Sequence, residues 1–178
     1  MKPGMKFKIC SGSALLITGL VFVLVYGIFQ APVPLAQDME MEMAKDIIVL
    51  KPEDLRVVAL GARVYTEACA SCHGAELEGE DNWREPLPGG GFRAPPHDET
   101  GHTWHHPDTQ LFQITKLGRV KYSEVVMNRT DIKSDMLGFE DTLSDAEIIA
   151  VLSYIKSTWP PHIKVQHDLV NRNVHPDH

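Results

Sequence analysis

The feature that most constrains this chain is a five-residue motif in which two cysteines and a histidine lie close together. Two residues separate Cys69 from Cys72, and His73 follows directly. This spacing lets two thiols bond to the two vinyl groups of one haem while the imidazole reaches the iron. The motif therefore predicts covalent haem attachment at Cys69 and Cys72, with His73 as a ligand of the iron.

Three other roles are open to a Cys-x-x-Cys pair. It can be half of a zinc site, but the third cysteine, Cys10, lies far away in an apolar segment. It can be a thioredoxin-like redox pair, but no strand-turn-helix pattern leads into it. It can also form a plain disulfide. The histidine directly after Cys72 favours haem attachment over all three.

The N-terminal 30 residues have the composition of a membrane anchor. Three lysines among the first eight residues precede 21 mostly apolar residues, Ile9 to Phe29, and no charged residue follows until Asp38. A helix of this length crosses a hydrocarbon core of about 30 Å, and flanking lysines favour a cytoplasmic N-terminus. We expect residues 1–30 to form a single-pass transmembrane helix, with the rest of the chain exported.

A cleavable secretory signal is the alternative to an anchor. Its apolar core usually spans only about 7 to 15 residues and ends at a small-x-small site. The segment 31–36 offers a poor site because prolines crowd it. We expect residues 31–51 to form a linker, extended at its proline-rich start. Within it, the alternating acids and methionines of residues 38–43 indicate a flexible stretch rather than a copper site.

The exported part is acidic. The first 30 residues carry three lysines and no acid, so residues 31–178 hold 14 lysines and arginines against 24 acidic residues, a formal charge of −10. This balance argues against nucleic acid as a partner. It fits either a redox partner with a basic docking patch or a surface that only keeps the protein soluble.

A helical pattern begins after Asp54 and runs into the cysteine motif. Apolar residues recur at spacings of three and four, which gives one apolar face: Leu55, Val58, Ala62, Tyr65 and Ala68. This helix would deliver both thiols and His73 from one rigid element. Gly61, in mid-helix, predicts close contact with another helix.

Residues 74–107 read as a long loop because prolines and glycines interrupt any regular pattern. A structureless stretch of this length needs a role in a compact domain. Packing over the edge of a flat cofactor is such a role, and Trp83 and Trp104 are the obvious cover.

Two further helices and one short turn are predicted. A short helix at 108–117 ends at Gly118, and a turn follows at 122–127. The last helix starts at Ser144 with a capping box that includes Glu147, and it ends near residues 159–161. Its apolar face comprises Ile148, Val151, Leu152 and Ile155. We expect residues 162–178 to form a flexible tail, and strands find little support.

The second axial ligand decides what such a haem can do. Met136 lies in a loop just ahead of the capped helix and is the best candidate. A thioether on the far side of the iron raises the reduction potential and leaves no open position for a substrate, which suits electron transfer. The alternative is that Met136 is a core residue.

The order of these elements over residues 54–159 resembles class I cytochrome c, an all-α fold of a few helices around one haem. The resemblance implies that Cys69 and Cys72 form the thioethers, His73 is the proximal ligand and Met136 the distal one. It implies a haem domain at 52–161. In that family the first and last helices cross near a glycine and an aromatic residue, matched here by Gly61 or Tyr65 and by Tyr154.

The chain departs from the family pattern in two places. Leu137 follows Met136 where the family often has proline, so the ligand loop is less constrained. The segment 82–108 is not general to the family and is similar to a subgroup of bacterial membrane-bound monohaem cytochromes.

The histidines of this segment are the rivals of Met136. One of them could be the sixth ligand, or two could bind copper or zinc, or they could hydrogen-bond a propionate or face water. They are His97, His102, His105 and His106. Three arginines are candidate propionate partners because guanidinium pairs with a carboxylate, although a surface position is the alternative for each: Arg84, Arg93 and Arg119.

The expected function is a single-haem electron carrier, with no catalytic residue. Its expected cofactor is one covalent haem c, and its partners are other redox proteins, such as a membrane oxidase or dehydrogenase. The expected location is a bacterial cytoplasmic membrane, with the haem domain on the periplasmic side. The alternatives are a haem-bearing subunit of a larger oxidoreductase and a haem enzyme with a labile sixth ligand.

Overall fold

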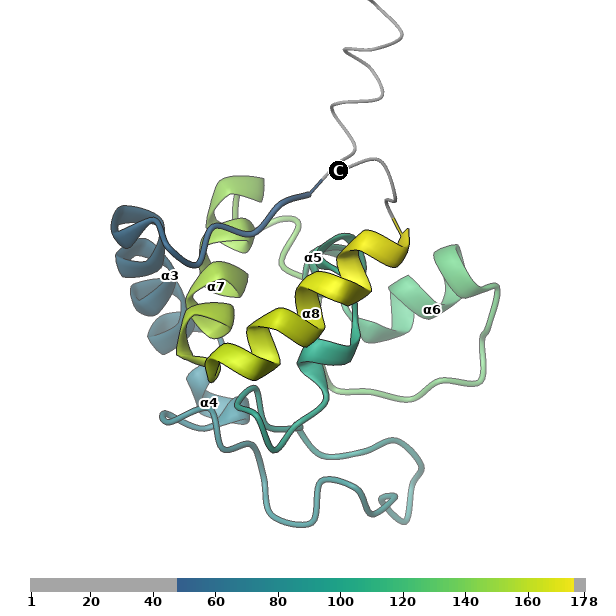
Figure 1. Cartoon of the computed structure of the whole chain (residues 1–178). Coiled ribbons are helices and arrows are strands. Elements are labelled where there is room, and N and C mark those ends of the chain that lie inside the picture. Colours follow the sequence, from purple (N-terminus) through teal and green to yellow (C-terminus); the bar gives the residue numbers. More distant parts are fainter. Residues whose placement is uncertain (1–47, 175–178) are drawn as a thin grey trace, which may run out of the picture. The chain divides into compact units, whose positions relative to one another are not determined.

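The computed structural model describes residues 48–174. In this part of the chain the fold is all-helical, with one isolated β-bridge between Pro86 and Phe92. The helices in chain order (Figure 1) are α3 (Leu55–Ala68), α4 (Ala70–His73), the 3-10 turn η1 (Thr103–His105), α5 (Asp108–Leu117), α6 (Arg119–Met127), α7 (Asp145–Thr158) and α8 (Pro161–Val174). The predicted all-α class is confirmed for these residues.

The predicted anchor at residues 1–30, the linker as far as residue 47 and residues 175–178 lie outside the described residues. Between residues 48 and 174, none of the helices combines the length and the apolar character needed to cross a membrane. The single-pass transmembrane helix therefore stays a prediction.

The start of α3 follows from its N-cap. The Asp54 carboxylate accepts hydrogen bonds from the backbone N–H of Arg56 at 3.0 Å and of Val57 at 3.4 Å, which satisfies two of the free donors of the first turn. The buried side of α3 is centred on Gly61, Val64 and Tyr65. Leu55 was predicted on this face, but it is 81% exposed because it lies more than a turn before the contact with α7.

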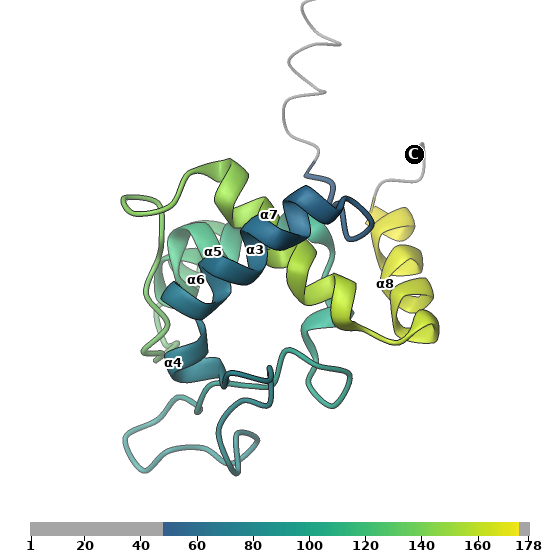
Figure 2. The ribbon, with the colours of Figure 1, turned by 90° about the vertical axis from the view of Figure 1, so that its left-hand side faces the viewer.

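The helices α3 and α7 cross at close contact. In Figure 2, α3 lies in front of α7. A Cβ added at Gly61 would overlap the backbone carbonyl of Ala150 and lie 2.8 Å from Cβ of Tyr154. The Tyr65 ring packs on the Tyr154 ring, with centroids 5.5 Å apart. The predicted role of Gly61 in helix contact is therefore confirmed.

The predicted capping box at the start of α7 is present. The Ser144 hydroxyl accepts from the Glu147 backbone N–H at 3.3 Å, and the Glu147 carboxylate accepts from the Ser144 backbone N–H at 2.9 Å. All four residues predicted on the apolar face of this helix are buried: Ile148, Val151, Leu152 and Ile155.

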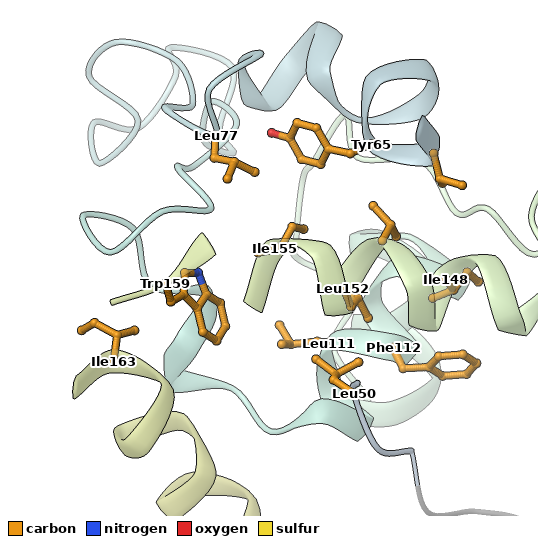
Figure 3. Packing of buried hydrophobic residues seen from close by; sticks show 12 residues of the cluster. Leu50, Tyr65, Leu77, Leu111, Phe112, Ile148, Leu152, Ile155, Trp159 and Ile163 are labelled. Carbon is orange, nitrogen blue, oxygen red and sulfur yellow. The ribbon is translucent and has the colours of Figure 1, made fainter. Parts of the chain in front are cut away.

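The hydrophobic core extends along α7 and receives side chains from two opposite sides of this helix (Figure 3). Tyr65 comes from α3, Leu111 and Phe112 from α5, and Leu77 from the long loop. Leu50 also lies in this core, and its N–H donates to Asp108 Oδ2 at 2.8 Å. The packed body thus begins before residue 52, the predicted boundary of the domain.

The prediction of a flexible tail over residues 162–178 is wrong for residues 162–174, which belong to the helix α8. Trp159 and the proline pair end α7, but the chain turns and α8 folds back over the domain (Figure 1). Ile163 and His167, one turn apart, are buried. Ile163 and His167 are the only buried residues of α8, so its apolar periodicity is too sparse to predict the helix from the sequence.

Asp108 connects α8 to the rest of the domain. Its Oδ1 accepts from Asn171 Nδ2 at 3.0 Å, and its backbone N–H donates to Asn171 Oδ1 at 2.8 Å. His167 lies beside it, with Nε2 3.0 Å from the His106 carbonyl, to which it donates. A buried carboxylate therefore joins α5, α8 and the segment entering α3.

The crossing predicts the effect of a single added methyl group at Gly61. In a helix exposed to solvent, Gly→Ala stabilises by about 1 kcal/mol. Gly61→Ala should instead lower the free energy of unfolding by about 1–3 kcal/mol, because the methyl group overlaps the α7 backbone. Denaturant unfolding measures this, with Glu67→Ala on the exposed side of α3 as the control. A more stable Gly61→Ala variant would contradict the crossing.

The His167 environment predicts a pH dependence. Burial lowers the pKa of His167 below its ordinary 6.5, and Lys156 lowers it further, whereas Asp108 and Asp168 act in the opposite direction. The unfolded chain then binds the proton more readily than the folded one. Stability is therefore retained above pH 6.5 and falls as the pH drops below it, towards the folded-state pKa.

His167→Gln should remove part of this pH dependence, because the amide can still donate to the His106 carbonyl but does not titrate. Denaturant unfolding between about pH 7 and pH 5 should give a shallower slope than in the wild type. His162→Gln, on the exposed side of the same helix, is the matched control. An equal slope in His167→Gln and wild type would contradict the prediction.

Candidate functional site

The cysteine motif comprises the C-terminal cap of α3 and the single turn of α4. Cys69 ends α3, with its N–H donating to the Tyr65 carbonyl at 2.9 Å. Its own carbonyl then accepts from His73 N–H at 3.0 Å, which closes the single turn of α4. Both thiols are free; Cys69 is half-buried and Cys72 is exposed. The predicted helix α3 ends at Cys69, and Cys72 and His73 lie in the separate turn α4, so the prediction that a single helix carries both thiols and the imidazole is correct only for Cys69.

The two thiols differ in environment. Burial raises the pKa of Cys69 to about 11, and the neighbouring Cys72 adds to this effect. Cys69 is therefore a neutral thiol near pH 7.

Tyr65 holds the end of this turn. Its hydroxyl donates to the Gly74 carbonyl at 2.8 Å and also lies 3.3 Å from the His73 carbonyl. Its ring is 1% exposed in the α3–α7 contact. The helix crossing and the motif are thus linked through one side chain.

The His73 ring is oriented by a hydrogen bond from the long loop. Nδ1 lies 2.9 Å from the Pro95 carbonyl, which can only accept, so Nδ1 carries the proton. Nε2 then keeps its lone pair for a metal, the arrangement in which a second partner fixes a ligand histidine. Burial of His73 lowers its pKa, and the Pro95 hydrogen bond acts in the opposite direction. The neutral form, which a ligand needs, is favoured.

A second histidine lies against the first. The His97 ring stacks on the His73 ring, with centroids 4.0 Å apart and planes 22° apart. His97 is half-buried, and this burial lowers its pKa well below the ordinary value. His97 is therefore a neutral aromatic neighbour of His73 near pH 7.

Met136 lies in the irregular segment between α6 and α7 and is half-buried. Beyond it, Gly138 lies so close to α5 that an added Cβ would be 2.8 Å from the Lys116 carbonyl oxygen. Ahead of it, Lys133 Nζ donates to the Gly89 carbonyl at 2.8 Å. Contacts on both sides of Met136 therefore hold this loop against the rest of the domain. The role of Met136 as an iron ligand stays a prediction.

The remaining histidines of residues 97–106 have separate neighbours. His102 stacks on Trp83, with centroids 5.3 Å apart, and exposed His105 stacks on Trp104 at 3.6 Å. His106 Nδ1 lies 3.2 Å from Gln110 Oε1. Across residues 48–174 there is no group of three or more histidines, cysteines or acids that could hold a metal ion. The structure gives no support to a second metal site there.

Two of the candidate propionate partners have protein partners of their own. Arg84 donates to the Thr100 carbonyl at 3.1 Å, with its guanidinium 4.1 Å from the Trp83 ring centroid. The Arg119 guanidinium lies near the Tyr122 ring and Met127 Sδ. Pairing of Arg84, Arg93 or Arg119 with a propionate stays a prediction.

Sequence reasoning missed three residues around His73. Pro95 was read only as a loop breaker, Trp159 only as a helix end, and Leu77 was not singled out. In the structure Trp159 Nε1 donates to the His97 carbonyl at 2.7 Å, and Leu77 is buried in the core. Their roles depend on how the loop folds back, for which a single sequence carries no signal.

The chemistry of this donor set fits a covalently bound haem. Two free thiols lie three residues apart on one turn, and the next side chain is a neutral imidazole with Nδ1 already occupied. Cys69 and Cys72 would hold the ring through thioethers, and His73 would hold the iron through Nε2.

Comparison with known proteins agrees with this arrangement. The family model described as Cytochrome c matches residues 58–159, more than half of the 178 residues, and the match includes the cysteine motif and α7. No curated protein and no solved structure gave a significant match. The chain therefore belongs to the cytochrome c family, and its cofactor is a covalently attached haem c.

Proposed function

We propose that this cytochrome c is a single-haem electron carrier of the class I type, with His73 and Met136 as axial ligands. The observation that carries the proposal is the Nδ1 hydrogen bond from His73 to the Pro95 carbonyl, since it leaves Nε2 for the iron. The chain contains one Cys-x-x-Cys-His motif, which supports one haem.

The bound haem supplies reversible one-electron chemistry. The chain would contribute burial and fixed ligands. Tyr65 holds the turn that carries the thiols and Pro95 orients His73. The loop held by Lys133 would present Met136. A sixth position filled by a thioether raises the potential and excludes substrates, which favours a carrier over a haem enzyme.

The site of action follows from the N-terminal sequence. Residues 1–30 would anchor the chain in a bacterial cytoplasmic membrane, with the haem domain on the periplasmic side. The partners would be other redox proteins, such as a membrane oxidase or dehydrogenase. Tethering would raise the effective concentration of the domain near such partners.

Met136→Ala should remove the methionine-to-iron charge-transfer band of the ferric protein, because no thioether would reach the iron. The reduction potential should fall by a sizeable part of the roughly 0.8 V range that axial ligands control. The reduced variant should bind carbon monoxide, whereas the wild type should not. Met127→Ala, at the end of α6, is the matched control and should keep the band.

A wild-type spectrum typical of two histidine ligands would contradict Met136 as the ligand and favour one of the rival histidines. Carbon monoxide binding by the reduced wild type would instead favour a haem enzyme with a labile sixth ligand.

The membrane proposal predicts the mature N-terminus. Mass spectrometry of the protein extracted from membranes should find residues 1–30 still present. The protein should need detergent for extraction, and deletion of residues 1–30 behind a cleavable signal should release a soluble cytochrome. A mature N-terminus after Ala31 would contradict the anchor and leave the haem assignment intact.

A further inference from the structure

We propose that His97 is a positioning residue that fixes the plane of the His73 imidazole against the iron. The inference rests on the proposed function only in taking His73 as the axial ligand. It adds a residue that neither the family match nor the motif assigns. The observation behind it is the near-parallel stack of the two rings, 4.0 Å between centroids.

One hydrogen bond does not define the plane of a histidine ring. The bond from Nδ1 to the Pro95 carbonyl holds one edge of the His73 ring, yet the ring can still tilt about that bond at small cost. The His97 ring covers one face, and a tilt towards it would bring ring atoms into overlap. The bond and the stack together limit this tilt towards His97.

His97 is itself firmly held, which a positioning residue requires. Its Nδ1 lies 2.8 Å from Thr103 Oγ1, and its backbone N–H donates to the Leu77 carbonyl at 2.8 Å. Its carbonyl accepts from Trp159 Nε1 at 2.7 Å. The ring also meets the Tyr65 ring edge-on, with centroids 6.3 Å apart. Contacts from α3, the end of α7 and two parts of the long loop thus converge on His97.

The orientation of an axial imidazole has a spectroscopic consequence. In ferric low-spin haem the direction of the imidazole plane determines how unpaired spin spreads over the ring. The haem methyl resonances and the g values report that direction. A change in protein stability alone would leave both readouts unchanged, so they separate a positioning role from a merely structural one.

The test compares variants of the full-length, haem-loaded protein. His97→Leu replaces the ring by an apolar side chain without a flat face, and should change the order or spread of the ferric haem methyl resonances and shift the largest g value. His97→Phe restores an aromatic face and should return both towards the wild type. His105→Leu, in the same loop but stacked on Trp104, should leave both unchanged.

Thr103→Val provides a second route if His97→Leu does not accumulate. It removes the Oγ1 partner of His97 and leaves the His97 ring in place, so it should shift the same resonances in the same direction by a smaller amount. Wild-type methyl patterns in both His97→Leu and Thr103→Val would overturn the inference. Equal changes in His97→Leu and His97→Phe would also overturn it, because stacking would then not be the cause.

The two proposals fail separately. If the wild type shows no methionine ligation, the His/Met carrier is contradicted. The haem methyl resonances of the His97 variants and the wild type can still be compared. An unchanged methyl pattern in a His97→Leu protein that keeps its charge-transfer band would defeat the positioning role alone.

Discussion

The close crossing of α3 and α7 is the contact on which the rest of the structure depends. Only a glycine at position 61 allows the backbone of Ala150 to approach so closely. The crossing buries Tyr65, and the Tyr65 hydroxyl holds the carbonyls at the end of the haem-binding turn. A contact between two helices therefore determines where Cys69, Cys72 and His73 are presented.

Contacts with the haem-binding turn, rather than regular secondary structure, hold the long loop in place. Its backbone at Pro95 accepts a hydrogen bond from His73, and two residues later its His97 ring covers the same imidazole. Trp159, at the end of α7, holds the His97 carbonyl. Polar backbone groups that a loop would otherwise leave to water are thus satisfied by the site itself.

The C-terminal helix α8 lies outside the matched cytochrome c segment, yet it is joined to the domain. Its contacts are polar as well as apolar. Asp108 accepts from Asn171 and from the Leu50 N–H, and Lys156 pairs with Asp168 at 2.6 Å. A buried carboxylate with several donors is stabilised only while all of them are in place. Leu50, just before α3, and the helix α8 are consequently coupled through Asp108.

The sequence by itself determined the cofactor and the local elements, because these depend on residues close together in the chain. The spacing of Cys69 and His73, the capping box at Ser144 and the glycine of α3 are signals of this kind. The tertiary structure alone decided the partners of His73 and the ordering of α8. Pro95 and His97 contact His73, and Trp159 contacts His97, only after the loop folds back. Only two residues of α8 are buried, too few to predict the helix from the sequence, and its contacts with Asp108 and Trp159 form only in the folded domain.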